Sequence, residues 1–253
     1  MRVTILRFLC LTLLALGMNG ARAKELKIIF SKYTPPYVFE DDRGGIVVDI
    51  VKTALESAGY TIQPIYVPIG RGFKMFADKQ VDGTTIIQES SGLKAFYSKD
   101  FMQYYNRAFA LKARNFNIRS IADLGDKSII AFQNADKYLG TDFGKMAAAN
   151  HKYKEMAQQE AQVHMLLLGR MDVAVMDESI FRYYRERLIS QGAADKSQAY
   201  IGFDIFPPTS FKAAFNDPAI RDEFDKGIAA MRKDGRYDAI YKKYTSQYFN
   251  IKK

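Results

Sequence analysis

Two short stretches repeat one pattern about ninety residues apart: Lys79-Gln80-Val81-Asp82-Gly83-Thr84-Thr85-Ile86-Ile87 and Gly169-Arg170-Met171-Asp172-Val173-Ala174-Val175-Met176-Asp177. In each, a helix-like segment ends in polar or glycine residues, and a short apolar run then begins at an aspartate. This order is typical of a buried parallel strand that follows a crossover helix. The upstream apolar runs Lys27-Ile28-Ile29-Phe30 and Ser128-Ile129-Ile130-Ala131-Phe132 repeat as well. The sequence therefore predicts a duplicated α/β unit.

The two copies differ at their ends, because only the second one finishes in an acid, Asp177. Folds of the α/β class bind ligands beyond the carboxyl ends of their sheet strands. Asp177 is therefore a candidate ligand contact, since its carboxylate accepts hydrogen bonds and pairs with cationic nitrogens. The alternative is that Asp177 caps a helix predicted over Ser179–Arg187.

Residues 1–23 have the features of a cleavable secretory signal peptide. Arg2 and Arg7 precede the apolar run Phe8–Met18, and Ala21-Arg22-Ala23 follows it. The run is shorter than the roughly 20 apolar residues that span a bilayer. The single cysteine, Cys10, lies within this run and lacks the small neighbours of a lipoprotein cleavage site. We expect a periplasmic mature chain without lipid, thiol or disulfide.

The charge pattern argues against a nucleic-acid partner. The formal net charge is +9, and it falls to +6 when the three arginines of the predicted signal peptide are removed. Lysines and arginines are scattered among acids, whereas nucleic-acid surfaces concentrate basic residues. His151 and His164 are the only histidines, so the sequence predicts no metal site. We also find no nucleophile elbow, phosphate loop or dinucleotide fingerprint, and expect no cofactor and no catalytic residues.

The coarse order of elements predicts two lobes joined by a two-strand hinge. Two short extended segments, Asn106–Leu111 and Phe203–Pro208, link the two repeated units, which is the arrangement expected of a hinge that closes on a ligand. We predict lobe 1 over residues 24–106 and 207–253, and lobe 2 over 107–206. The segments predicted for lobe 1 are strands at Lys27–Phe30, Thr61–Val67, Val81–Ile87 and Ser210–Phe215, and helices at Ile46–Ala58, Gly72–Asp78, Asp217–Arg232 and Asp238–Phe249. In this interpretation the C-terminus completes lobe 1.

Nearly the whole mature chain resembles the bacterial extracellular solute-binding proteins of family 3, best known as periplasmic receptors of amino-acid transporters. The order and spacing of several short motifs carry the resemblance: Pro35-Pro36-Tyr37, Gly44-Gly45, Asp49, Val81-Asp82-Gly83, Tyr97-Ser98-Lys99-Asp100-Phe101, Ile121-Ala122-Asp123-Leu124, Gly169-Arg170-Met171-Asp172, Val175-Met176-Asp177-Glu178, Met231-Arg232-Lys233-Asp234-Gly235-Arg236-Tyr237 and Ile240-Tyr241-Lys242-Lys243-Tyr244. The resemblance implies a type II periplasmic binding fold, that is, two Rossmann-like α/β lobes. It also implies a small solute in the cleft between them, a monomer, and an inner-membrane transporter permease as partner.

In the family, an acid at the position of Asp177 binds the α-ammonium group of an amino acid, and an arginine after the first Val-Asp motif binds its α-carboxylate. The stretch Gly83–Leu93 is shorter than usual and holds no arginine. Arg71, between two glycines that let the backbone approach a ligand, is the candidate replacement. The other interpretation is a solute that lacks a carboxylate, namely an amine or a neutral molecule with an aromatic-facing surface.

Six further residues complete the predicted site. The family stacks an aromatic ring on the solute near Thr34, so Tyr33 or Tyr37 is expected to serve here. Hydroxyls of Thr84 and Thr85 lie at a strand end, with one of the pair expected to face the core. Gln133 and Asn134 lie at a helix N-terminus, where backbone N–H groups favour an anion. There the following Asp136 is expected to satisfy the terminus and repel an anionic ligand.

Three functions are compatible with these residues. The first is a solute-binding protein that captures an amino acid or a related amine-bearing compound for a membrane transporter. The second is a periplasmic enzyme of the cyclohexadienyl dehydratase type, for which Asp177 or Glu178 is the candidate acid. The third is a stand-alone sensor that docks on a membrane partner. The sequence favours the first, because a binding cleft is predicted and catalytic motifs are not found.

Overall fold

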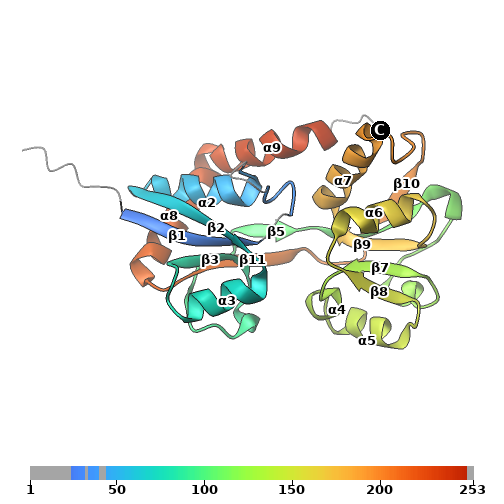
Figure 1. Ribbon diagram of the computed structural model, residues 1–253, viewed down its shortest axis with the longest axis horizontal. Helices are drawn as coiled ribbons and strands as arrows, with labels where there is room; N and C mark the ends of the chain where they lie inside the picture. Colours follow the sequence, from blue (N-terminus) through green and yellow to red (C-terminus); the bar gives the residue numbers. More distant parts are fainter. Residues whose placement is uncertain (1–23, 32–33, 40–43, 250–253) are drawn as a thin grey trace, which may run out of the picture.

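The computed structural model describes residues 24–31, 34–39 and 44–249, so the predicted signal peptide at 1–23 lies outside the described residues. Two lobes lie side by side, each built around its own sheet, and extended strands connect them in the middle of the molecule (Figure 1). The predicted two-lobed α/β architecture is confirmed. Among the described residues, none of the helices combines the length and the hydrophobicity of a membrane span.

The sheet of lobe 1 has the strand order β2-β1-β3-β11-β4, and β5 pairs with β11 beside it. β1 pairs in parallel with both β2 and β3, whereas β11 runs antiparallel to β3. The strands are β1 (Lys24–Ser31), β2 (Tyr60–Val67), β3 (Gly83–Ile87), β4 (Phe96–Tyr97), β5 (Met102–Tyr104) and β11 (Thr209–Phe215).

The sheet of lobe 2 repeats this arrangement in the order β10-β6-β9-β7-β8. Three parallel strands come from the second copy of the repeat, and the antiparallel neighbour β6 takes the place that β11 has in lobe 1. The strands are β6 (Asn106–Leu111), β7 (Ile129–Phe132), β8 (Tyr153–Met156), β9 (Val173–Asp177) and β10 (Tyr200–Phe203). The predicted linking strand Asn106–Leu111 is thus an inner strand of lobe 2.

Helices cover both faces of each sheet (Figure 1). On one side of lobe 1 lie α2 (Ile46–Glu56), α8 (Pro218–Asp234) and α9 (Arg236–Phe249), and on the other lies α3 (Ile69–Ala77). In lobe 2, α6 (Gln159–Leu167) and α7 (Glu178–Ser190) face α4 (Ala135–Tyr138) and α5 (Thr141–Ala149) across the sheet. Short 3-10 turns are found at Glu89–Ser91, Lys112–Arg114 and Ile121–Leu124.

The aspartate of each repeated stretch has the same structural role. Asp82 Oδ2 accepts a hydrogen bond from the Lys27 N–H at 2.8 Å, and Asp172 Oδ2 accepts one from the Ser128 N–H at 2.9 Å. In return, the N–H of each aspartate donates to the carbonyl of that same residue, Lys27 or Ser128. Each pair joins the aspartate just before the third parallel strand to the first strand, within β1 at Lys27 and just before β7 at Ser128. The repeated aspartate thus connects the same two strands in both sheets.

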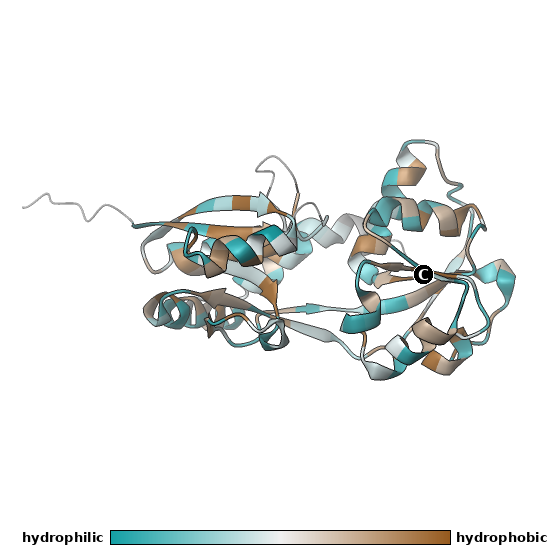
Figure 2. Cartoon of the chain, turned by 60° about the horizontal axis from the view of Figure 1, so that its bottom comes forward, coloured by the Kyte–Doolittle hydropathy of each residue, from teal (hydrophilic) through white to brown (hydrophobic). Residues whose placement is uncertain are grey.

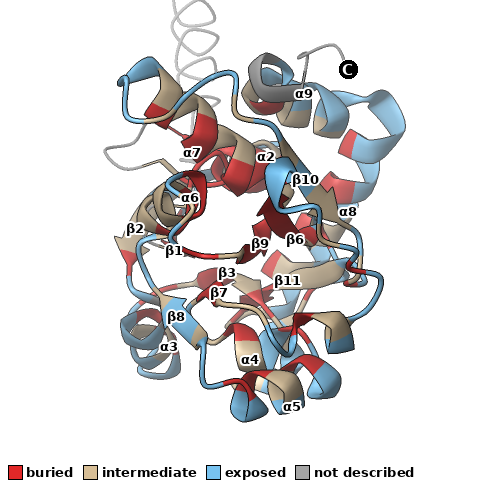
Figure 3. Ribbon diagram, turned by 90° about the vertical axis from the view of Figure 1, so that its right-hand side faces the viewer, coloured by how far each residue is buried: buried red, intermediate tan, exposed pale blue. Residues whose placement is uncertain are grey.

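Hydrophobic residues concentrate on the strands and on the inner helix faces (Figure 2), and the strands at the centre of each lobe are largely buried (Figure 3). On the side of α2, α7 and α9, a single apolar cluster runs through both lobes and includes Phe30 and Val51 of lobe 1 and Phe109 and Phe181 of lobe 2. The opposite faces form two separate clusters. The lobes are therefore packed against each other on one side only.

The C-terminal helix contacts both lobes. It was predicted to complete lobe 1, and α9 does pack on α2 and α8, but it also contacts α7 of lobe 2. The chain crosses to lobe 2 at Tyr105, between β5 and β6, and returns between Phe203 and Thr209. The predicted lobe limits at residues 106 and 206 remain predictions, and the first of them falls inside β6.

One conformational difference between the two repeats gives a stability prediction. Lys79 and Gly169 occupy the same left-handed position after α3 and α6, with φ of 54° and 69°. Both helices end with the same two hydrogen bonds of a Schellman motif, which are donated by the left-handed residue and by the residue after it. The left-handed region suits glycine and costs a side-chain-bearing residue about 1–2 kcal/mol. We expect Lys79→Gly to raise the free energy of unfolding by about 0.5–1 kcal/mol, after the greater chain entropy of unfolded glycine is subtracted.

Gly169→Ala is the matched control, expected to lower the free energy of unfolding by about 1 kcal/mol. Its added Cβ would meet no atom closer than 3.9 Å, so backbone conformation alone is tested. Urea unfolding followed by circular dichroism measures both. Destabilisation by Lys79→Gly would contradict the equivalence of the two helix ends.

Candidate functional site

A cavity of about 190 Å³ lies between the lobes, beside the strands that join them. Its walls come from the ends of β1 and β3 in lobe 1, from the crossing strands, and from the ends of β7 and β9 and the helices near them in lobe 2. Most of the surface of this lining is apolar. The lining residues are Ser31, Thr34, Ile86, Tyr104, Asn106, Phe132, Gln133, Tyr138, Gln159, Asp177, Ile180, Thr209 and Phe211.

Asp177 is the only Asp, Glu, Lys, Arg or His among these lining residues. It is the last residue of β9 and the N-cap of α7. Its Oδ1 accepts hydrogen bonds from the N–H groups of Ser179 (2.8 Å) and Ile180 (3.1 Å). The alternative interpretation, that Asp177 caps the following helix, is therefore confirmed. Capping does not exclude ligand contact, because the same residue also lines the cavity.

Asp177 also receives hydrogen bonds from outside α7. Its Oδ1 accepts one from the Tyr37 hydroxyl of lobe 1 at 3.1 Å, and its Oδ2 accepts one from the Tyr105 N–H at 2.8 Å. Within the described part of the chain, Oδ2 has this single hydrogen bond. A carboxylate oxygen has two acceptor positions, so one position on Oδ2 is not used by any described donor.

Burial dominates the acid–base behaviour of this carboxyl group. The side chain of Asp177 is almost wholly removed from water, and this desolvation raises the pKa of Asp177 to about 6, against the lowering effect of the four hydrogen bonds. Burial likewise raises the pKa values of Tyr37 and Tyr104 well above the usual value for tyrosine. At neutral pH the site therefore combines one carboxylate with uncharged aromatic residues.

The position of Tyr37 follows from the loop before α2. The N–H groups of Ile46 and Val47, at the start of α2, donate to the carbonyls of Pro36 and Tyr37 at 3.0 Å. Gly45 permits this approach: a Cβ at residue 45 would lie 2.3 Å from the Tyr37 carbonyl oxygen. The loop is thereby fixed on the helix. The Tyr37 ring is fully buried and stacks on Tyr104, with ring centres 4.2 Å apart.

A β-bulge brings Ile86 into the cavity wall. In the pairing of β3 with β11, Thr85 and Ile86 lie opposite the single residue Ala213. Ile86 has φ of 55°, a conformation that a β-branched residue rarely adopts. The bulge turns Thr85 inward, where its hydroxyl donates to the Ile29 carbonyl at 3.0 Å. As a result β3 presents an apolar side chain to the cavity, and neither of the predicted threonines.

The predicted site residues are placed as follows. Gln133 and Asp177 line the cavity. Thr84 and Thr85 are buried in the sheet of lobe 1, Tyr37 is buried against Tyr104, and Arg71 is exposed in the first turn of α3. None of these four lines the cavity in this structure. Tyr33 lies outside the described residues.

The helix end at Asn134 already binds an acid of the protein. Glu155, on the neighbouring strand β8, accepts hydrogen bonds from the N–H groups of Asn134 (2.7 Å) and Asp136 (3.1 Å). The expectation that Asp136 satisfies this terminus is wrong, because an acid on the adjacent strand occupies it. The consequence expected from the sequence holds: the N–H groups of Asn134 and Asp136 are used within the protein.

Sequence reasoning missed most of the apolar lining. Tyr104 lies with Tyr97, Phe101 and Tyr105 in an aromatic-rich segment just before the first crossing, and this spacing is a usable sequence signal. Phe132 and Phe211 each lie next to a strand end or a crossing, and nothing in the sequence distinguishes them from core residues. Ile86 reaches the cavity only because of the bulge, which the sequence pattern does not reveal.

Solved structures show the same fold at low sequence identity. An ancestral arginine-binding protein bound to arginine superposes with a TM-score of 0.69 at 20% identity, covering 88% of this chain and 99% of that one. A substrate-binding protein of an ABC uptake transporter from Streptococcus pneumoniae, with bound histidine, gives 0.67 at 17% identity, covering 90% and 95%. An ancestral amino-acid-binding protein, described as a precursor of cyclohexadienyl dehydratase, gives 0.65 at 19% identity, covering 87% and 95%.

At these identities the likeness establishes the fold, which is that of type II periplasmic binding proteins. No curated protein matches the chain by sequence comparison. A family profile does match, over residues 26–247, which includes both lobes and both crossings. The chain belongs to the bacterial extracellular solute-binding proteins, family 3.

Proposed function

We propose that this chain is a periplasmic solute-binding protein that captures a small amine-bearing solute between its lobes and presents it to an inner-membrane transporter. The observation that carries the proposal is the interlobe cavity with one buried carboxylate in its wall. A solute in this cavity contacts lobe 1, lobe 2 and both crossing strands. Its binding therefore favours the arrangement in which the lobes meet, and a transporter could recognise that arrangement.

The available acceptor position on Asp177 favours a cationic or strongly donating group. Burial makes the ionised carboxylate unfavourable, and a protonated amine at hydrogen-bond distance compensates for this cost. Such a pair would resemble the ammonium contact that the family resemblance implies for this position. The proposed contact thus rests on the chemistry of a single residue that lines the cavity.

The surroundings do not favour a carboxylate on the solute. No lysine, arginine or histidine occurs among the lining residues within the described ranges. The N–H groups at Asn134 and Asp136 are used by Glu155. A solute carboxylate would therefore be buried near Asp177 without a described cation, and like charges in a desolvated site repel each other. We infer that an amine without a carboxylate fits better than a zwitterionic amino acid.

The apolar walls favour a solute with a hydrophobic or planar body. Tyr104, Phe132 and Phe211 present aromatic rings, and Ile86 and Ile180 present branched aliphatic side chains. Aromatic faces attract cations and stack on planar groups. An amine attached to a flat or aliphatic body would use the acid and these walls together.

A second candidate function is an enzyme of the cyclohexadienyl dehydratase type. The observation that favours it is the raised pKa of Asp177, about 6, which suits a general acid near neutral pH. The substrates prephenate and arogenate carry carboxylates, however, for which the described lining offers no cation. Turnover of either compound by the wild-type protein, lost in Asp177→Asn, would support the enzyme over the binding protein.

The solute itself tests the main proposal. Native mass spectrometry of the freshly purified protein is expected to detect a retained small molecule, and calorimetry with the identified compound is expected to show one site. Asp177→Asn leaves a cationic group without its counter-charge, so affinity should fall by about 2–5 kcal/mol, which is about 30-fold to several thousand-fold.

Glu178→Gln is the matched control for this variant. Glu178 is the next residue, but its carboxylate is ion-paired with Arg107 and Arg182 and does not line the cavity. Its substitution should change solute affinity by less than about threefold. Equal losses in the two variants would count against a direct role of Asp177.

The affinity should depend on pH in a defined direction. A cation binds the ionised form of Asp177, whose pKa in the solute-free protein is about 6. Affinity should therefore be constant above pH 7 and fall about tenfold for each pH unit below 6. Calorimetry between pH 4.5 and 8 measures this profile. An affinity that stays constant down to pH 5, or rises there, would contradict cation binding by Asp177.

Pairs of compounds that differ only in the carboxylate test the inferred solute class. Agmatine and arginine, histamine and histidine, and tyramine and tyrosine are suitable pairs. We expect the amine of at least one pair to bind about tenfold or more tightly than its amino acid, since the acid adds a buried charge. Lys32 lies in the sequence between the lining residues Ser31 and Thr34 but outside the described residues. Lys32→Gln is therefore the control for a cation that the described lining does not include. If an amino acid binds more tightly than its amine, and Lys32→Gln removes this difference, the solute is an amino acid and not an amine.

A further inference from the structure

Three hydroxyl groups from three different elements connect to the carboxylate of Asp177. Tyr241, on α9, lies 3.5 Å from the Tyr37 hydroxyl and 3.3 Å from the Ser179 hydroxyl. Tyr37 donates to Asp177 Oδ1 at 3.1 Å, and the backbone N–H of Ser179 donates to the same oxygen at 2.8 Å. These contacts form a closed circuit that begins and ends at the acid in the cavity wall.

The direction of the hydrogen bonds follows from counting protons. A tyrosine or serine hydroxyl has a single proton to donate. The Tyr37 hydroxyl uses its proton in the hydrogen bond to Asp177, so the Tyr37 oxygen accepts a hydrogen bond from Tyr241. The proton of Tyr241 is thereby used, so Tyr241 accepts from Ser179. All three hydroxyls therefore point the same way along the circuit, towards the carboxylate, and hydrogen bonds aligned in this way strengthen one another.

We propose that Tyr241 is a positioning residue for the solute-binding acid: its hydroxyl orients Tyr37 on Asp177 and, through Ser179, holds the C-terminal helix on lobe 2. The solute-binding part of this statement rests on the proposed function, whereas the hydroxyl circuit does not. Tyr241 and Tyr37 belong to lobe 1, and Asp177 and Ser179 belong to lobe 2. The circuit therefore exists only in lobe arrangements that keep α9 against α7.

The packing on this side of the molecule supports such a coupling. The apolar cluster that runs through both lobes includes Tyr241 at its edge, and Phe39 of lobe 1 meets the Tyr183 ring of α7 at 5.7 Å. A hinge rotation that separates α9 from α7 would break the series of hydroxyl donors that leads through Tyr241 and Tyr37 to Asp177. The hydrogen bonding of the Asp177 carboxylate is thus coupled to the arrangement of the lobes.

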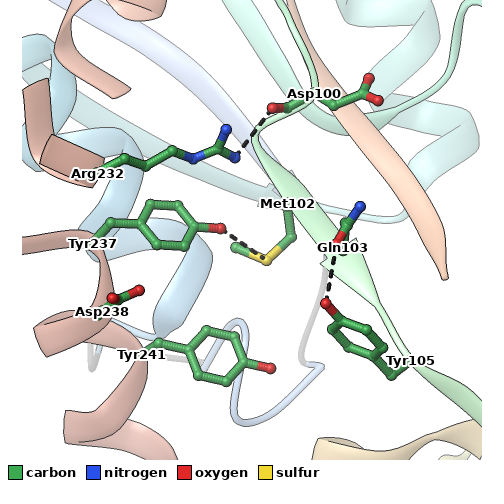
Figure 4. A pocket seen from close by; sticks show the side chains of 8 residues that line it. All are labelled: Asp100, Met102, Gln103, Tyr105, Arg232, Tyr237, Asp238 and Tyr241. Carbon is green, nitrogen blue, oxygen red and sulfur yellow. Dashed lines mark hydrogen bonds between the residues drawn. The ribbon is translucent and has the colours of Figure 1, made fainter. Parts of the chain in front are cut away.

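A second cavity lies beside this circuit. It measures about 460 Å³, lies between α8, α9 and the first crossing, and is lined by Tyr105 and Tyr241, among others (Figure 4). The N–H of Tyr105 is the donor to Asp177 Oδ2. Tyr105, which supplies this backbone donor, and Tyr241, which acts through Tyr37, therefore both line the second cavity.

The same helix supplies a matched control. The Tyr244 hydroxyl, nearly one turn further along α9, donates to Asp49 at 2.7 Å and accepts from the Gly45 N–H, both within lobe 1. The Tyr237 hydroxyl donates to the Phe101 carbonyl at 2.7 Å, also within lobe 1. Loss of either hydroxyl affects the attachment of α9 to lobe 1 without entering the circuit. A structural effect on α9 can thus be separated from positioning of the acid.

The ionisable groups around Asp177 do not obscure the titration of its carboxyl group. The titratable groups that face it are Tyr37, Tyr104 and Tyr241, and burial raises the pKa of each above the usual tyrosine value, so they stay neutral up to pH 8. On its own helix, Glu178 is ion-paired. A transition near pH 6 can therefore be assigned to the carboxyl group of Asp177.

The test is a carboxyl ¹³C NMR titration of solute-free protein, with the Asp177 signal identified by its loss in Asp177→Asn. The donor chain stabilises the ionised form, so its removal should raise the midpoint. We expect Tyr241→Phe to raise it by about 0.5–1 pH unit, Tyr37→Phe to raise it by at least as much, and Tyr244→Phe to leave it unchanged. The same upward shift should appear in the pH profile of solute affinity for Tyr241→Phe.

Two results would overturn the proposal. The first is a midpoint in Tyr241→Phe within 0.1 pH unit of wild type. The second is an equal shift in Tyr244→Phe, which would assign the effect to a general loosening of α9. Because the titration needs no solute, failure here leaves the proposed binding function intact. A failure to find any bound solute would leave the positioning result intact.

Discussion

The carboxylate of Asp177 is held out of water at the junction of the two lobes by hydrogen-bond donors that come from both of them. Burial makes its charge costly, and the N–H groups of Ser179, Ile180 and Tyr105 together with the Tyr37 hydroxyl compensate only in part, so the pKa stays near 6. An acid in this condition gains most from a further cationic partner. The proposed preference for an amine, the expected pH dependence of binding and the proposed role of the C-terminal helix all depend on this one desolvated group.

The duplication explains why the acid lies where it does. In both lobes an aspartate joins the third parallel strand to the first, and this places the ends of β3 and β9 beside the crossings. The copies differ at those ends. β9 finishes at Asp177, which caps α7, whereas β3 ends in a bulge that presents Ile86. The end of β9 thus contributes charge to the cavity, and the end of β3 contributes an apolar side chain.

Sequence periodicity was sufficient for the architecture and for placing Asp177 at the end of a strand and the cap of a helix, because strand ends and helix caps are local properties. It was insufficient for residues whose direction depends on tertiary contacts. Thr85 turns inward because of a bulge opposite Ala213, and the N–H groups at Asn134 are occupied by Glu155 from a neighbouring strand. The contact of α9 with lobe 2 includes the hydroxyl of Tyr241, which has no sequence signature distinct from its neighbours.

The most direct test of the central claim is a crystal structure of the protein with the solute that it retains through purification. The account predicts a solute nitrogen within about 3.2 Å of Asp177 Oδ2, with the solute body against Tyr104 and in contact with both lobes. It also predicts that the Tyr37–Asp177 hydrogen bond persists. A solute bound elsewhere, or one bound in the cavity through a carboxylate with no donor near Asp177, would contradict the account.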